Sequence, residues 1–360
     1  MIKKILSVVL TVAMALMLAS CGGKTLSEVI DEKEIIIDTQ AQNAEGLTEE
    51  NAKEATTSRF PAKVSLADPD ILSGKQVGFS ISKATDDEWS RQLVTAIEEL
   101  GEYYGASVEC DDANMDEETQ VRDIEKMIAD EYDVIFVDAV SASGPCNAID
   151  EAGEEGIPVI TCYDECDSDV ETHVTWDAYE GGKVFAEYFI NYVKEHNGDD
   201  KVKVVELTNS ASVRAAERYK ALHEAIEADS EVNIEIVDSL ETEGQRENAY
   251  LGIESEKKAF DYVISDVDNG AQGAVAALHA LGTSDAKVFS MSAYGAEPFT
   301  ALHSNDEYYV AFLDVDPWVL ASIMYRCAIN SIFGKENAAV TYIDSYIVDG
   351  SNVEDFWTFD

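Results

Sequence analysis

Short apolar runs alternate with stretches of helical periodicity from Lys75 to the end of the chain. Each run is short enough for a strand whose two faces are both covered. Between the runs, apolar residues recur every three or four positions, and the first such set is Trp89, Leu93, Ile97 and Leu100. Strands that alternate with helices in this way predict parallel sheets with right-handed crossovers.

The alternation falls into two series. In the first we expect strands at 76–82, 107–110, 133–138 and 156–161, and helices at 87–104, 117–129, 148–155 and 180–195. In the second we expect strands at 202–207, 232–237, 262–265, 287–291, 309–313 and 340–347, and helices at 213–228, 246–260, 269–281, 297–303 and 317–333. Two such series predict an α/β fold of two doubly wound parallel-sheet lobes with a cleft between them.

Residues 1–21 have a different pattern. Lys3 and Lys4 precede a nearly unbroken apolar run, which ends at Leu18-Ala-Ser-Cys21. This is the pattern of a bacterial export signal. The placement of Cys21 resembles a lipobox, which implies that the cysteine is acylated and that the mature chain begins there, tethered outside the cytoplasm. The run is shorter than the ~20 residues of a membrane span. The alternative is an ordinary secretory signal with a chance cysteine.

Residues 22–72 have the composition of a linker. They are rich in Glu, Thr, Ala, Asn and Gln, a mixture that buries too little apolar surface to offset the entropy of ordering the chain. The sequence therefore predicts a signal peptide at 1–21, an acidic flexible linker at 22–72 and a folded domain at 73–360.

The chain is strongly acidic, with 72 Asp and Glu against 25 Lys and Arg and a formal net charge of -47. Such a surface repels phosphate backbones, which argues against nucleic-acid binding. It also argues against lying flat on an anionic membrane, so the lipid on Cys21 is the expected membrane attachment. A hydrophobic fraction of 46% is normal for a globular protein.

Cysteine usage leaves one question open. If Cys21 is acylated, an odd number remains: Cys110, Cys146, Cys162, Cys166 and Cys327. Cys162 and Cys166 form the one close pair, and they fit a disulfide, half of a metal site or two small apolar residues. A zinc site needs about four ligands, and no second Cys/His pair has ligand spacing, so we expect no metal. The cysteines after Cys21 are most simply packing residues.

Ligands of doubly wound sheets bind beyond the carboxyl ends of the strands. The residues found there are carboxylates, aromatics, a serine and one arginine: Asp87, Trp89, Asp138, Tyr163, Asp164, Trp176, Arg218, Asp266, Asp268, Ser292 and Asp314. Carboxylates accept hydrogen bonds from sugar hydroxyls, arginine donates them, and aromatic rings pack on the C–H faces of a pyranose. The set predicts a site for a monosaccharide-like ligand. The alternative is that the acids only cap the helices that follow.

Four segments carry a resemblance to a known family: Lys83-Ala-Thr-Asp-Asp-Glu-Trp-Ser90, Gly156-Ile-Pro-Val-Ile-Thr161, Asp177-Ala-Tyr-Glu-Gly-Gly-Lys183 and Ala215-Ala-Glu-Arg218. Together with the alternation over 78–333, they resemble the type I periplasmic binding proteins, particularly the ribose- and galactose/glucose-binding branch. The resemblance makes Asp87 and Trp89 the first-loop acid and stacking aromatic, and Arg218 the ligand-contacting arginine. The chain departs from the pattern at Ser292, where an Asp is usual, and at Asp314, where an Asn or Gln is usual.

The resemblance implies a solute-binding lipoprotein of an ABC importer, with no cofactor. It would capture a monosaccharide-like ligand by hinge closure, and a membrane permease would recognise the closed form. It also implies a three-strand hinge near Trp176, Asp314 and Asn337. Lobe one is then 73–176 plus 315–337, and lobe two is 177–314 plus 338–360.

Three alternatives stay open. A receptor of the same fold could report ligand occupancy to a membrane kinase or chemoreceptor. Several carboxylates in one cleft could instead favour a cationic, amine-bearing ligand. Paired acids could serve a glycosidase. However, the chain has no Ser/His/Asp or Cys/His arrangement and no glycine loop for phosphates, so we do not expect an enzyme.

Overall fold

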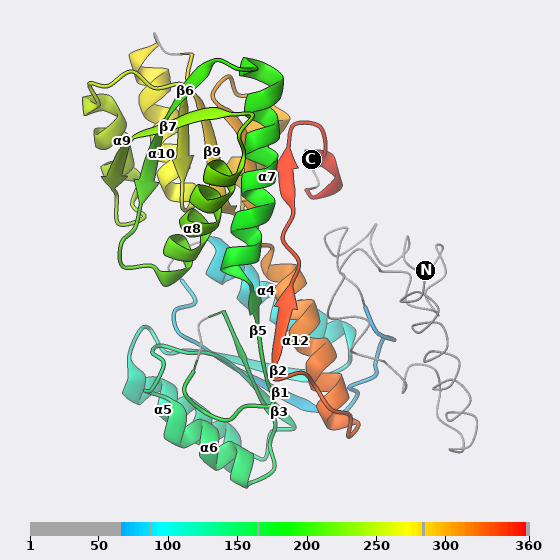
Figure 1. The fold of residues 1–360 in the computed structure, drawn as a ribbon. Coiled ribbons are helices and arrows are strands. Elements are labelled where there is room, and N and C mark those ends of the chain that lie inside the picture. The colour runs from blue at the N-terminus through cyan, green and yellow to red at the C-terminus, as the bar shows by residue number, and fades with distance from the viewer. Residues whose placement is uncertain (1–65, 86–87, 164–165, 283–284, 358–360) are drawn as a thin grey trace.

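Two α/β lobes lie one above the other in the computed structural model, which describes residues 66–85, 88–163, 166–282 and 285–357 (Figure 1). The predicted fold class is confirmed. The predicted signal peptide, Cys21 and nearly all of the predicted linker lie outside the described residues, as do Asp87 and Asp164.

The first lobe is built on a parallel sheet in the order β11-β5-β4-β3-β1-β2. Its strands are β1 (Gln76–Ile81), β2 (Ser107–Asp112), β3 (Val134–Asp138), β4 (Val159–Cys162), β5 (Thr172–Trp176) and β11 (Val340–Ile343). Helices α4 (Glu88–Tyr103) and α12 (Pro317–Ile332) pack together, and so do α5 (Glu117–Ala129) and α6 (Cys146–Glu154). Both faces of the sheet are therefore covered, and β3 is buried along its whole length.

The second lobe has a sheet in the order β12-β10-β9-β8-β6-β7. Its strands are β6 (Lys201–Thr208), β7 (Asn233–Glu241), β8 (Tyr262–Ser265), β9 (Lys287–Ala293), β10 (Tyr309–Asp314) and β12 (Ile347–Asp349). Its helices are α7 (Ala178–Asn197), α8 (Val213–Ala228), α9 (Arg246–Ser255), α10 (Asp268–Leu281) and α11 (Ala296–His303), followed by the 3-10 turn η2 (Val353–Asp355). Helix α7 packs on α8, and α9 packs on α10. The edge strand β12 is antiparallel to β10, where an all-parallel sheet was expected.

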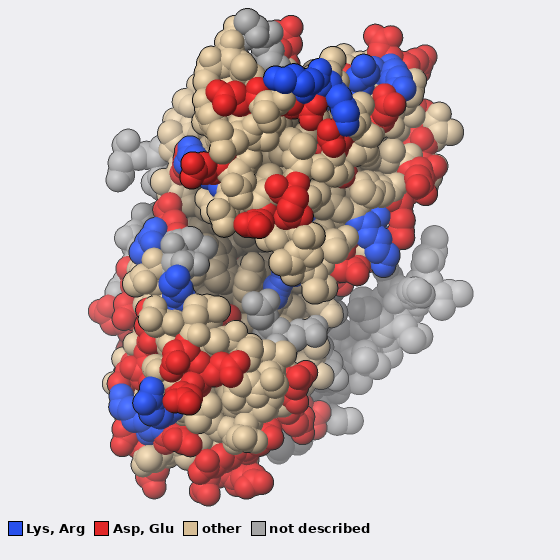
Figure 2. Space-filling view, turned by 90° about the vertical axis from the view of Figure 1, so that its left-hand side faces the viewer, with Lys and Arg blue, Asp and Glu red and all other residues tan. Residues whose placement is uncertain are grey.

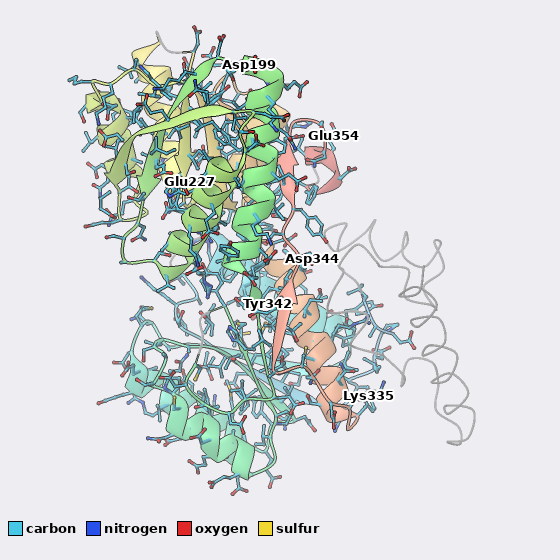
Figure 3. The ribbon with its side chains drawn as sticks, viewed as in Figure 1. Asp199, Glu227, Lys335, Tyr342, Asp344 and Glu354 are labelled. Atoms are coloured by element: carbon cyan, nitrogen blue, oxygen red, sulfur yellow. The ribbon has the colours of Figure 1, made fainter. Side chains whose placement is uncertain are left out.

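The single last strand predicted at 340–347 is wrong, because two strands occupy this stretch. Strand β11 pairs with β5 of the first lobe, and β12 pairs with β10 of the second. The polar residues Asp344 and Ser345 interrupt the apolar run, and the chain passes between the lobes there; Tyr342 and Asp344 mark the place in Figure 3. The third crossing thus lies at 344–346 rather than near Asn337, and 340–343 belong to lobe one.

Strand β5 was not predicted, because its residues are polar. Thr172 is nevertheless fully buried, and its hydroxyl lies 3.1 Å from that of Thr341 on β11. The His173 ring is bonded to the Thr161 hydroxyl of β4 at 3.0 Å. Polar side chains that satisfy one another across neighbouring strands can be buried without a large penalty. Within the described ranges, no helix combines the length and apolarity that a membrane span requires.

The chain crosses between the sheets after β5, after β10 and after β11. Helix α12 begins just after the second crossing, where Asp316 accepts a hydrogen bond from the backbone N–H of Trp318 at 2.8 Å and Pro317 fills the first helical position. The Tyr325 hydroxyl donates to the carbonyl of Ile97 at 2.7 Å and so fixes α12 on α4. Both helices start at the interface between the lobes, where the candidate residues gather.

Candidate ligand-binding site

Three predicted aromatic residues come together where the lobes meet. The ring centre of Trp89, at the start of α4, lies 4.8 Å from that of Tyr163 and 6.4 Å from that of Trp176. The Trp89 indole Nε1 donates to the carbonyl of Val315 at 2.7 Å, on the second crossing. The cluster therefore joins the end of β4, the end of β5 and the hinge, and it leaves part of each ring exposed.

Tyr163 has a backbone conformation that is rare for a bulky residue. Its φ is 61°, in the left-handed region. Its N–H donates to the carbonyl of Val174 at 3.1 Å, and its own carbonyl accepts from the Thr175 hydroxyl at 3.1 Å. These bonds to β5 hold the conformation in place. Strain that is held in this way is common at ligand sites.

Arg214, in the first turn of α8, reaches from the second lobe to the first. Its guanidinium lies 4.0 Å from the centre of the Tyr163 ring, and it also donates a hydrogen bond to the Tyr163 carbonyl. Ser212 caps this helix by accepting from the N–H of Ala215 at 3.2 Å. Arg214 is not among the residues that the sequence predicts for the site, although it directly precedes the Ala215–Arg218 motif.

Arg218 and Asp266 form the buried polar centre of the site. Arg218 Nη2 donates to the backbone carbonyl of Asp266 at 3.0 Å. The Asp266 side chain has no exposed surface, and no described residue donates to either carboxylate oxygen with acceptable geometry; Arg218 Nε likewise has no acceptor among the described residues. Burial raises the pKa of Asp266 to about 6, while Arg218 and nearby backbone N–H groups partly oppose this. Burial also lowers the pKa of Arg218, and Tyr163 is among the charges that act on it.

Close packing of α7 against α8 fixes the position of Arg218. A Cβ atom on Gly182 of α7 would lie 2.7 Å from the Arg218 carbonyl oxygen and 2.8 Å from its Cα. Only a glycine permits this approach of the two helices.

Asp138 is held at the end of β3 by two neighbours. The Ser82 hydroxyl, just after β1, donates to Asp138 Oδ2 at 2.5 Å. Gln120 donates to the Asp138 carbonyl at 2.9 Å and accepts from the N–H of Val140 at 2.8 Å. Asp138 is nearly fully buried, so these bonds determine its position.

A second acidic group lies near the second crossing. Burial raises the pKa of Tyr294 well above 10, and the carboxylates of Asp316, Asp314 and Glu88 raise it further, which places all three near the tyrosine. Asp314 is buried at the end of β10, where its N–H donates to the Tyr346 carbonyl at 2.8 Å. Glu88 of the first lobe accepts from the N–H of Ala296 of the second at 3.3 Å.

Two further predicted site residues, Ser292 and Asp268, are bonded to residues other than those described above. Ser292 is partly buried near the end of β9, and its carbonyl accepts from the Ser290 hydroxyl at 3.0 Å. Asp268 accepts from the Tyr309 hydroxyl at 3.1 Å and from Gln272 Nε2 at 3.2 Å. Burial raises the pKa of Asp268 to about 7. Tyr309 begins β10, at the opposite end from Asp314, so Asp268 is not joined to the Arg218 centre.

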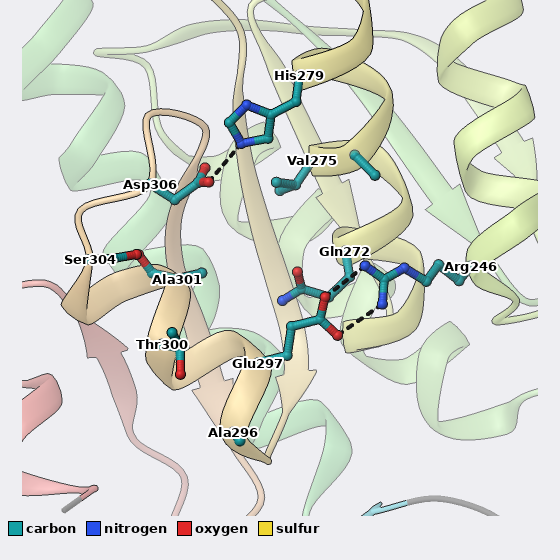
Figure 4. Close-up of a pocket in the computed structure, with 11 residues that line it drawn as sticks. Arg246, Gln272, Val275, His279, Ala296, Glu297, Thr300, Ala301, Ser304 and Asp306 are labelled. Atoms are coloured by element: carbon teal, nitrogen blue, oxygen red, sulfur yellow. Dashed lines mark hydrogen bonds and ion pairs between the residues drawn. The ribbon is translucent and has the colours of Figure 1, made fainter. Parts of the chain in front are cut away.

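Gln272 belongs to a groove of about 530 Å³ between α10 and α11, outside the interlobe site (Figure 4). Its charged residues are paired with one another. Arg246 makes two hydrogen bonds of 2.8 and 2.6 Å to Glu297, and His279 lies 2.7 Å from Asp306. The groove therefore offers few unpaired charged groups to a ligand.

The surface agrees with the acidic composition. Figure 2 shows Asp and Glu spread over both lobes, with a recess where the lobes meet. Among the described residues, no group of three or more His, Cys, Asp or Glu could hold a metal ion. No disulfide joins any of the five described cysteines; Cys162 is buried, and Cys166 lies beside Cys146.

Comparisons with known proteins agree with this architecture. Residues 77–336 match a family model described as a periplasmic binding protein domain. The D-xylose-binding periplasmic protein of Escherichia coli K12 is 28% identical over 220 residues, 58% of this chain and 64% of that protein. The chain spans under two thirds of the length of the curated relatives that it matches (64% and 63%).

Solved structures share the fold. An arabinose-binding protein from Geobacillus stearothermophilus has a TM-score of 0.67 at 17% identity, with 79% of this chain and 100% of that chain covered. An ABC transporter periplasmic solute-binding protein from Actinobacillus succinogenes with bound D-allose has a TM-score of 0.66 at 21% identity, with 78% and 100% covered. At these identities the likeness establishes the fold alone.

Proposed function

Because the chain belongs to the periplasmic binding protein domain family, we propose that it is an extracytoplasmic solute-binding lipoprotein of an ABC importer. In this proposal it captures a monosaccharide-like ligand between its two lobes and delivers it to a membrane permease, while a lipid on Cys21 keeps it near the membrane. The names of its relatives, which bind D-xylose, arabinose or D-allose, support a sugar ligand and a binding protein rather than an enzyme.

The observation that carries the proposal is the Arg218–Asp266 centre. The two Asp266 oxygens have no hydrogen bond of acceptable geometry within the described residues, and a buried polar group in that state costs about 1–3 kcal/mol or more, part of which a ligand can recover. Neighbouring hydroxyls of a sugar would donate to the two Asp266 oxygens, and a ligand oxygen would accept from Arg218 Nε. The partly exposed rings of Trp89, Tyr163 and Trp176 would pack against the C–H faces of the same sugar.

The charges of the site favour a neutral polyol over a cationic amine. Arg214 and Arg218 lie beside the aromatic cluster and bring two positive charges to it. Asp138 already accepts a hydrogen bond from Ser82. An amine would meet both arginines, whereas a hydroxyl can donate to the carboxylates and accept from the arginines.

The mechanism in this proposal is hinge closure. Ligand contacts made by both lobes stabilise the closed arrangement relative to the open one, by as much as the ligand's affinities for the two forms differ. The Arg214–Tyr163 contact joins the lobes without a ligand atom, so it would add to the closed form.

A thermal-shift screen of pentoses, hexoses, inositols, amino sugars and polyamines tests the ligand class, because a ligand that binds only the folded state raises its melting temperature. Calorimetry on the wild type and Asp266→Asn then tests the site. We expect one or more neutral sugars to bind and Asp266→Asn to lose about tenfold or more in affinity. Asp199→Asn, an exposed acid of the second lobe, is the matched control.

Stabilisation by polyamines alone would contradict the sugar proposal. So would a sugar that binds the wild type and Asp266→Asn equally well, because the Arg218–Asp266 centre would then have no part in recognition.

A further inference from the structure

Two cysteines that are far apart in sequence lie side by side in the first lobe. Cys146 is the first residue of α6, and Cys166 stands 20 positions later, in the segment between β4 and β5. Their sulphur atoms are 3.9 Å apart, and both side chains are partly exposed.

Hydrogen bonds hold the two segments together around the sulphurs. The carbonyl of Ala142 accepts from the N–H of Asp167 at 2.8 Å and from the Cys146 thiol at 3.3 Å. The Ser168 hydroxyl donates to the carbonyl of Cys146 at 3.3 Å. A disulfide needs an S–S distance of ~2.05 Å, so the sulphurs must approach by less than 2 Å, roughly what small side-chain rotations provide.

We propose that Cys146 and Cys166 form a disulfide once the protein has left the cytoplasm. The inference rests on the proposed extracytoplasmic location, because disulfides persist in oxidising compartments. This pairing differs from Cys162–Cys166, which is the close pair in the sequence. It also gives Cys146 and Cys166 a role beyond that of packing residues. Cys162 is fully buried on β4, whereas Cys146 and Cys166 can both be reached by an oxidant.

The oxidant is a second disulfide, such as that of a thiol–disulfide oxidoreductase or oxidised glutathione. The thiolate of one cysteine attacks this disulfide, forms a mixed disulfide and releases one thiol. The thiolate of the other cysteine then attacks the protein sulphur of the mixed disulfide and releases the second thiol. The protein gives up two protons and two electrons, and the reagent leaves as two thiols.

The crosslink would act on the candidate ligand site. Cys166 lies three positions after Tyr163, which carries the contact to Arg214. Tying Cys166 to α6 limits how far the end of β4 can move. We therefore expect the oxidised protein to bind its sugar a few-fold more tightly than the reduced protein, because the crosslinked segment loses less conformational freedom on binding.

The test uses the full chain, purified without reductant and incubated with oxidised glutathione. Free thiols are alkylated, and the peptides are analysed by mass spectrometry with and without reduction. We expect a Cys146–Cys166 linked peptide. A reductant should lower the melting temperature of the wild type by ~5 °C, since the crosslink closes a loop of about 20 residues. It should not affect Cys146→Ser or Cys166→Ser.

Cys110→Ser is the matched control, because Cys110 lies on β2 of the same lobe and should leave the reductant effect intact. Alkylation of both Cys146 and Cys166 after oxidation would overturn the proposal, and so would a linked Cys162–Cys166 peptide. Sugar binding by the oxidised wild type separates the two proposals: if it binds sugar while no Cys146–Cys166 crosslink forms, only the disulfide proposal fails.

Discussion

The guanidinium of Arg214 lies 4.0 Å from the centre of the Tyr163 ring and also donates a hydrogen bond to the carbonyl of the same tyrosine. One side chain of the second lobe therefore contacts one residue of the first lobe twice. Tyr163 in turn packs beside Trp89, which is bonded to the hinge at Val315. The interlobe contact, the aromatic cluster and one crossing thus form a continuous set of contacts.

We predict that Arg214→Ala weakens sugar binding by about three- to thirtyfold, because a cation–π contact and a charged hydrogen bond that join the lobes are both lost. The affinity of Arg214→Lys should lie between those of the wild type and Arg214→Ala, since lysine keeps the charge but not the planar fork. Calorimetry measures both. Arg122→Ala is the control, because Arg122 is exposed on α5. Full affinity in Arg214→Ala would remove this contact from the closing mechanism.

Trp89 has two functions that substitutions can separate. Trp89→Ala removes the ring and the indole donor to Val315, whereas Trp89→Phe removes the donor but keeps a smaller aromatic ring. If the ring packs on the sugar, we expect Trp89→Ala to lose about tenfold in affinity and Trp89→Phe to lose less. Trp357→Ala, which removes a ring stacked on Phe299 of the second lobe, should lower stability without changing affinity. Equal affinity in the wild type and Trp89→Ala would refute stacking.

The sequence predicts strand β3 but does not predict strand β5, and the reason is physical. Strand β3 is an uninterrupted apolar run, because both faces of its sheet are covered. The polar Thr172 of β5 can be buried because its hydroxyl meets that of Thr341, 169 residues later, on the neighbouring strand β11. Local periodicity carries no information about a partner so distant, and for the same reason the boundary between β11 and β12 was missed.

In the candidate site, too, contacts between distant parts of the chain could not be predicted from local sequence patterns. Arg218 and Asp266 could be predicted, because the strand-end rule points to both residues and the Ala215–Arg218 motif also points to Arg218. Arg214 could not, because its role depends on the distance between two lobes that no local pattern encodes. Asp268 satisfies the strand-end rule equally well, yet it is bonded to Tyr309 and Gln272.

Gly182 should be intolerant of substitution. We predict that Gly182→Ala lowers the free energy of unfolding by about 1–3 kcal/mol, because the added methyl meets the backbone of Arg218 and forces α7 and α8 apart. It should also weaken sugar binding by displacing Arg218. Gly153→Ala is the matched control: no atom lies within 4 Å of the added carbon, so the substitution should stabilise α6 by about 0.5–1 kcal/mol. Urea unfolding measures both, and equal effects would contradict the packing argument.

The hydrogen bond between His223 and Glu206 should make a contribution to stability that depends on pH. His223 Nε2 lies 2.6 Å from Glu206 Oε1, and this bond raises the pKa of His223 above 6.5. A histidine whose pKa is raised on folding stabilises fully below its unfolded pKa, and the contribution disappears as pH rises through the folded value. We expect His223→Gln to lose about 1 kcal/mol or less at pH 6, because the histidine is partly exposed, and still less at pH 9.

Urea unfolding of the wild type and His223→Gln at both pH values measures this difference. Ser239→Ala removes a hydrogen bond of 3.0 Å to the same glutamate from a donor that does not titrate between pH 6 and 9, so its effect should be similar at both pH values. A His223→Gln deficit that does not shrink at high pH would show that the pair does not titrate as proposed.

Because of Asp266, we predict that the affinity for sugar and the stability of the ligand-free protein change with pH in opposite directions. Its pKa in the folded, ligand-free protein is about 6, above its unfolded value. Between these values the folded state binds more protons than the unfolded state, so Asp266 makes the ligand-free protein more stable as pH falls from 7 to 5. Sugar hydroxyls donate best to the ionised carboxylate, so the dissociation constant should rise as pH falls through 6, by about tenfold at pH 5.

Calorimetry in two buffers of different ionisation enthalpy at pH 5.5 should detect a proton released on binding, because the ligand favours ionised Asp266. Asp266→Asn should bind weakly at every pH and release no proton, whereas Asp199→Asn should behave like the wild type. If Asp266→Asn keeps the wild-type pH dependence, another carboxylate titrates with the ligand, and Asp138, bonded to Ser82 at the end of β3, is the next residue to substitute.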